Sequence, residues 1–160
     1  MTGHTHTGNA AGQSQYGRLL LMIVLSFVAM YVLMYAMVNS FANVYMNVNQ
    51  VYMAGLMAAP MGLIELVLMR TMYRNKRLNA TVIAGSLVAL TVFWTSIRQQ
   101  TIVSDEQFLR SMIPHHAGAI LMCEEAPIQD AEIRTLCKGI VSSQRAEIDQ
   151  MKAKLRGLEH

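Results

Sequence analysis

The stretch LLLMIVLSFVAMYVLMYAMV, from Leu19 to Val38, contains no charged residue. At about 1.5 Å per residue, a helix of this length crosses a hydrocarbon core of about 30 Å. Two further apolar stretches follow at about 48–69 and 80–97, although Glu65 interrupts the first of them. The third is short for a span, so a buried soluble helix is its alternative. Together they predict a transmembrane region over residues 19–97, with the lipid bilayer as its partner.

The composition agrees with a membrane protein. Of 160 residues, 53% are hydrophobic and only 14% are charged, which is apolar for a soluble domain. The net charge of +3 is modest, and no basic run is interleaved with aromatic residues, so nucleic acid is not an expected partner. Methionine is frequent, with 14 residues, and could serve either as apolar filler or as a soft metal ligand.

Basic residues predict the orientation. The loop between spans two and three contains Arg70, Arg74, Lys76 and Arg77, whereas the loop at 39–50 carries no charge. Basic loops stay in the cytoplasm, so we expect a cytoplasmic N-terminus and a non-cytoplasmic chain after Ile97; Arg98 opposes this weakly. Residues 1–18 are polar, lack the apolar core of a signal peptide, and predict a disordered tail.

A linker at 98–103 precedes a second domain at 104–156, with the pattern of two amphipathic helices. Ser104 or Asp105 can cap the first helix, which should end near Ala126 before Pro127. Its predicted apolar face is Phe108, Met112, His115, Ala119 and Met122. Asp130 can cap the second helix, whose stripe is Ile133, Cys137, Ile140, Gln144, Ile148, Met151 and Leu155. The fold class is therefore all-α, with three spans followed by a helical hairpin.

Two helices cannot enclose a large core. We expect the hairpin to be half of a ferritin-like four-helix bundle, completed by a homodimer or a higher homo-oligomer. Packing against the membrane helices is the alternative. The spacing of Cys123 and Cys137 is not that of a thiolate metal motif, and it leaves a disulfide between them open.

A loop centred near Ile128 would place Met112 level with Gln144, and His115 and His116 level with Ile140 and Val141. Gln144 stands in an apolar stripe, where an unpaired amide costs roughly 1–3 kcal/mol, so it should have a partner. Met112, His115, His116 and Met122 offer thioether and imidazole on one side of a helix, a combination suited to Cu(I); imidazole alone also suits Cu(II) or zinc. Core filling is the alternative.

Other chemistry finds little support in the sequence. The Glu-x-x-His pairs of di-iron bundles, nucleophile–base arrangements and Gly-rich phosphate loops are not found, so no enzyme is predicted. Two methionine stripes in the spans, Met30, Met34 and Met37, and Met46, Met53, Met57 and Met61, read more simply as lipid-facing filler than as Cu(I) sites. Glu65 is expected in an interfacial pair with Arg70 or a helix contact, rather than in transport.

The strings DEQFLRSMIPHHAGAILM (105–122) and QRAEIDQM (144–151) resemble the domain-of-unknown-function 305 family over about Ser104 to Leu155. The resemblance implies a ferritin-like bundle, exported or membrane-anchored, with several members associated with copper binding and tolerance in bacteria. The matching motif positions, and hence the predicted metal ligands, are Met112, His115, His116, Met122, Gln144, Glu147 and Met151.

Ligand chemistry and resemblance together predict a non-catalytic copper-binding protein of the bacterial inner membrane. Its periplasmic or extracellular domain would sequester Cu(I) or hand it to other copper-handling envelope proteins. A structural or interaction module without metal is the main alternative, and a transporter subunit is a third.

Overall fold

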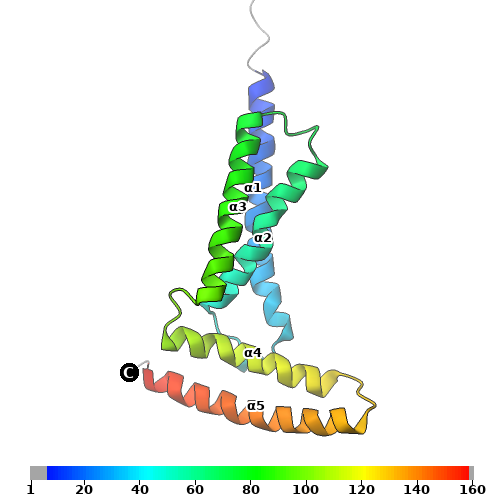
Figure 1. Ribbon diagram of the computed structural model, residues 1–160, viewed down its shortest axis with the longest axis vertical. Helices are drawn as coiled ribbons and strands as arrows, with labels where there is room; N and C mark the ends of the chain where they lie inside the picture. The colour runs from blue at the N-terminus through cyan, green and yellow to red at the C-terminus, as the bar shows by residue number, and fades with distance from the viewer. Residues whose placement is uncertain (1–6, 159–160) are drawn as a thin grey trace, which may run out of the picture. The chain divides into compact units, whose positions relative to one another are not determined.

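The computed structural model describes residues 7–158, and they form helices without a strand (Figure 1). The elements are α1 (Thr7–Leu33), η1 (Met34–Met37), η2 (Phe41–Asn43), α2 (Val48–Leu68), α3 (Lys76–Gln99), α4 (Asp105–Glu125) and α5 (Ala131–Leu158). The segments Gln15–Met37, Val48–Leu68 and Lys76–Gln99 are long and apolar enough to cross a membrane. The predicted all-α class, with three candidate spans followed by further helices, is confirmed.

The start of α1 differs from the expected tail at 1–18. The helix begins at Thr7, so residues 7–18 are helical, and residues 1–6 lie outside the described part of the chain. Extending an existing helix needs no new nucleus, and the strongly apolar turns after Arg18 supply that helix.

The chain divides into two compact units. In the described residues, the first comprises 7–31 and 51–101, and the second comprises 32–50 and 102–158. The boundary at 101–102 falls in the expected linker. The sequence did not predict that the second unit would include the segment 32–50, which runs from the end of the first candidate span to the start of the second.

Within the first unit, small residues of α2 let the helices approach closely. A Cβ added to Gly55 would lie 2.4 Å from the Phe93 ring of α3, and one added to Gly62 would lie 3.0 Å from Ser86 Oγ. Glu65 accepts a hydrogen bond from the Tyr73 hydroxyl at 3.3 Å. Its hydrogen-bond partner is thus a buried tyrosine of the α2–α3 loop, whereas the sequence suggested Arg70 or a helix contact.

In the second unit, α4 and α5 lie side by side as an antiparallel hairpin (Figure 1). The predicted caps are confirmed: Ser104 Oγ accepts from Gln107 N at 3.3 Å, and Asp130 Oδ1 accepts from the backbone N–H of Glu132 and of Ile133 at 2.9 Å. Cys123 and Cys137 form a disulfide, with Cα atoms 5.3 Å apart, beside the turn that joins the helices.

The hairpin core is formed by Ile113, Ala117, Ile120, Ile148 and Leu155. The apolar face predicted for α4 is therefore wrong. Phe108 and Met122 remain 50% and 54% exposed, because the buried face starts one residue later, a rotation of about 100°. Both faces contain apolar residues at helical spacing, so periodicity alone does not select between them.

The segment 32–50 covers part of this core. Val38 and Tyr45 pack against it, and Gln107 Oε1 accepts from the backbone N–H of Val48 at 3.0 Å. The Met37 carbonyl also lies against α4 at Gly118, where an added Cβ would be 3.4 Å from that oxygen, an ordinary contact distance. The sequence predicted that a second copy of the hairpin, or else the membrane helices, would cover this surface. In the structure, the segment 32–50 of the same chain covers part of it.

Candidate metal site

His115 and His116 lie midway along α4. Their ring centroids are 6.1 Å apart, with an interplanar angle of 58°. His115 is exposed, whereas the side chain of His116 retains only 12% exposure beside α5. Neighbouring residues on a helix point about 100° apart, so the two imidazoles occupy different environments although they are adjacent in sequence.

Glu147 of α5 holds His116 from the facing helix. Its Oε2 lies 3.1 Å from His116 Nδ1, and its Oε1 accepts a hydrogen bond from Ser143 Oγ at 2.6 Å. Ser143 was not predicted, although its position four residues before Glu147 is a spacing at which helical side chains meet. Ser143, Glu147 and His116 thus form a short polar chain, in which the contact with His116 is a close approach of charged or polar atoms and Nδ1 makes no hydrogen bond among the described residues.

The pKa of His116 is lowered from its usual value, chiefly because burial disfavours the charged ring; Glu147 opposes this shift and His115 adds to it. The neutral imidazole is the form that binds metals. The site therefore offers one largely buried, uncharged imidazole.

The level pairing expected from the loop position is wrong for His116, which meets Glu147 rather than Ile140 or Val141. Side chains on a helix lean toward its N-terminus. In an antiparallel pair, this lean moves contacts to later residues on both helices. The disulfide shows a shift in the same direction. If residues at equal heights faced each other, Cys123 would lie opposite Ile133, but it bonds to Cys137, four residues later.

The other predicted ligands are distributed around this pair. Met112 is half-buried one turn before His116, and Met122 is exposed nearly two turns beyond it. Met151 packs against the hairpin core. Gln144 has a buried amide oxygen, and this atom has no hydrogen-bond partner among the described residues. The sequence predicted a hydrogen-bond partner for Gln144, and the described residues provide none for its amide oxygen.

Across residues 7–158, no three His, Cys, Asp or Glu side chains come together as a metal-binding group. The arrangement brings together two imidazoles and one carboxylate that lies beside one of them. Metal donors beyond the imidazoles would have to include thioether sulfur or the Gln144 oxygen.

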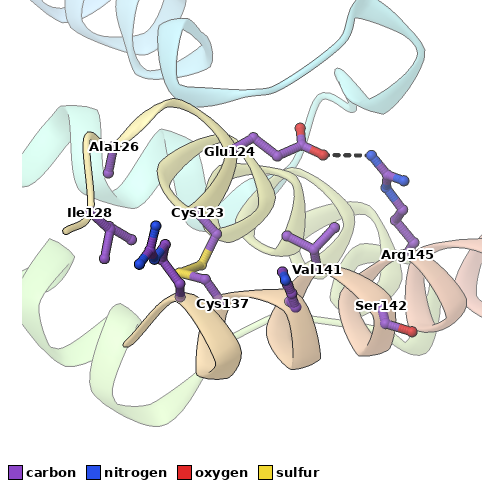
Figure 2. Close-up of a pocket in the computed structure, with 10 residues that line it drawn as sticks. Cys123, Glu124, Ala126, Ile128, Cys137, Val141, Ser142 and Arg145 are labelled. Atoms are coloured by element: carbon purple, nitrogen blue, oxygen red, sulfur yellow. Dashed lines mark hydrogen bonds and ion pairs between the residues drawn. A yellow bond between two sulfur atoms is a disulfide. The ribbon is translucent and has the colours of Figure 1, made fainter. Parts of the chain in front are cut away.

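A separate hollow of about 610 Å³ lies at the disulfide end of the hairpin (Figure 2). Glu124 and Arg145 are paired at 2.5 Å beside it, and Arg134 and Lys138 also line it. None of the predicted metal ligands does. This end of the hairpin is therefore a distinct feature of the surface.

Comparison with known proteins finds one family model, described as "Domain of unknown function (DUF305)", that matches residues 91–155. A relative from Acanthamoeba polyphaga mimivirus, named "Uncharacterized protein L153", is 31% identical over 108 residues. The alignment covers 66% of this chain and 69% of the relative. No solved structure matches.

Proposed function

The chain belongs to the DUF305 family, and from that premise we propose that it is a non-catalytic, membrane-anchored copper-binding protein. Its second unit would bind Cu(I) outside the cytoplasm and sequester it or hand it to other copper-handling proteins of the bacterial envelope. The observation that carries this proposal is the 3.1 Å approach of Glu147 Oε2 to His116 Nδ1, a buried atom that makes no hydrogen bond in the described residues. Histidine ligands of metals characteristically donate their second ring N–H to a carboxylate, which fixes the tautomer and raises ligand basicity.

The spacing of the two histidines suits one shared ion. Metal–nitrogen bonds of about 2 Å would place an ion about 3 Å from each ring centre. The observed centroid separation of 6.1 Å is close to twice that distance. One ion could therefore bind both rings once a nitrogen of each faces it, and His115 is exposed and free to turn.

Nearby sulfur favours copper over zinc. Met112 is within one turn of both histidines, and Met151 is on the same helix as Glu147, four residues later. Thioethers are soft ligands that suit Cu(I) and add little for zinc. The buried, unpartnered oxygen of Gln144 is a further polar atom that an ion or its bound water could satisfy. Met122 is farther along α4 and would be a peripheral donor.

The Cys123–Cys137 disulfide supports placement of the second unit outside the cytoplasm, because disulfides persist in oxidising compartments. The basic loop at 70–77 supports the same orientation, with a cytoplasmic N-terminus. Both observations suit the inner membrane of a bacterium.

The test uses full-length protein in detergent and a competition titration against a Cu(I) chelator. Replacing both His115 and His116 with alanine should abolish high-affinity binding, whereas Met112→Leu or Met151→Leu should weaken it and preserve the fold, since Leu and Met have similar volumes. Lys154→Gln on the exposed side of α5 is the control. Undiminished affinity in a folded double-alanine protein would place the site elsewhere, for example at the membrane methionines, or at His4 and His6 outside the described residues.

The competing proposal is a structural or interaction module without metal. It draws on apolar side chains that the second unit leaves exposed: Phe108, Met122, Ile133 and Leu136. Such a surface fits a second copy or another protein. Wild-type protein that binds no Cu(I) in the titration, but is oligomeric, would favour this alternative.

A further inference from the structure

Basic residues form a stripe along one side of α5. Successive members are four, seven, seven and four residues apart: Arg134, Lys138, Arg145, Lys152 and Arg156. At 3.6 residues per turn, these spacings keep all five within about 40° around the helix axis. We call this set the basic stripe. It lies on a different side of α5 from Glu147, and none of its members belongs to the proposed copper site.

Most side chains of the basic stripe are exposed, and few of them are paired with an acidic side chain. Four of its members are exposed, and Lys152 is half-buried. Arg145 pairs with Glu124 of α4, and within residues 7–158 no ion pair joins the other four. Asp149 is the acidic residue on the same side of α5, between Arg145 and Lys152. The stripe therefore has a net positive charge over most of the helix length.

Two hollows lie in a row along the stripe. The first, of about 610 Å³, is lined by Arg134, Lys138 and Arg145; Arg145 is labelled in Figure 2. The second, of about 280 Å³, is lined by Arg145 and Lys152. Arg145 is common to both, so each hollow presents basic side chains that are offset along one helix. Repeated anionic groups would match this arrangement better than a single compact ion.

The second hollow is tethered close to the membrane by the chain itself. Asn39 and Asn43 also line it, and they belong to the segment that joins the first two spans. Asn39 is six residues beyond the end of α1 at Leu33, and Asn43 is five before the start of α2 at Val48. Even fully extended, six residues reach only about 20 Å. The hollow therefore stays within reach of lipid headgroups in any arrangement of the two units.

We propose that the basic stripe binds the phosphate groups of anionic phospholipids in the bilayer that holds the three spans. The α5 helix then lies along the membrane surface. Anionic lipids attract Lys and Arg near the surface, and the attraction falls off within a Debye length. Docking would fix one face of the second unit to the membrane.

The test is lysine acylation of the full-length protein, followed by mass spectrometry, in nanodiscs of phosphatidylcholine alone or of an equimolar mixture with phosphatidylglycerol. Lys138 and Lys152 should react several-fold more slowly in the anionic discs. Lys154, exposed on another side of α5, is the internal control and should change little. At about 1 M salt, where the Debye length is about 3 Å, the difference should disappear.

A matched pair of variants separates the stripe from general charge. Arg134→Gln with Arg156→Gln should reduce the lipid-dependent protection of Lys138 and Lys152, whereas Lys154→Gln should leave it unchanged; circular dichroism checks the helices. Equal reactivity in the two kinds of disc would overturn the proposal. So would equal protection by millimolar inorganic phosphate in neutral discs, because the stripe would then bind phosphate from solution rather than lipid.

Discussion

Glu147 Oε2 lies 3.1 Å from His116 Nδ1 and joins α5 to the centre of α4. If this contact orients a metal ligand, Glu147→Gln should weaken Cu(I) binding by about 10–100-fold, the usual cost of losing such a partner. Asp149→Asn removes a carboxylate two residues away and should have little effect. The measurement is a chelator competition with both variants in parallel. Equal losses in the two variants would mean that only the overall charge matters.

The lowered pKa of His116 predicts how stability depends on pH. The unfolded protein binds a proton at His116 more readily than the folded protein does, with a midpoint near 6.5. The free energy of unfolding should therefore fall as the pH drops through 6.5 toward the lower folded pKa, and this contribution should be constant above 6.5. Denaturant unfolding of copper-free protein at stepped pH measures it, with His116→Gln as the reference. If the two pH profiles coincide, His116 does not carry the effect.

The disulfide predicts both stability and topology. Cys123 and Cys137 are 14 residues apart, and closing a loop of this size is worth about 3 kcal/mol. The Cys123→Ser, Cys137→Ser variant should unfold at correspondingly lower denaturant concentration. In intact cells, the wild-type thiols should resist maleimide until a reductant is added.

Reporter fusions test the orientation independently. A reporter active only outside the cytoplasm should work after Leu155 and fail after Asn75. The reverse pattern, or cysteines that react without reductant, would contradict a non-cytoplasmic second unit and with it the envelope role.

The helices and their caps could be predicted from sequence because their causes are local. An uncharged stretch such as 19–38 is long enough to be a span wherever it occurs, and Ser104 and Asp130 cap the helices that immediately follow them. The packing partner of the hairpin could not be predicted in this way. Val38 and Tyr45 reach the core from a segment more than sixty residues earlier in the chain.

The contacts between residues of the candidate site were predicted in part. His116 and Glu147 were both identified, but equal backbone heights placed Ile140 opposite His116, because that rule neglects the lean of helical side chains. Ser143 was missed, since a serine on a polar helix face carries no distinctive signal. The copper ligands themselves remain a prediction.

Self-association should depend on the exposed side of the hairpin. Phe108 is 50% exposed on α4. Phe108→Gln should shift the full-length protein toward monomer in light scattering. Phe41→Gln is the matched control, because Phe41 is 97% exposed on η2. Full-length protein is required, since removing residues 32–50 would expose the hairpin core. A wild-type monomer at micromolar concentration would contradict the expected homo-oligomer.

Packing in the first unit should be sensitive to a single methyl group on α2. A Cβ at Gly55 would lie 2.4 Å from the Phe93 ring, whereas one at Gly85 of α3 meets nothing within 4 Å. Gly55→Ala should therefore force the ring aside and cost about 1–3 kcal/mol, as overpacking does. Gly85→Ala should be neutral or slightly stabilising, because alanine favours helix. Thermal unfolding in detergent compares the two.

Adding Phe93→Leu should restore part of the loss in the Gly55→Ala protein, since a smaller side chain leaves room for the methyl group. Equal stability of the two alanine variants would show that α2 and α3 do not pack closely at Gly55.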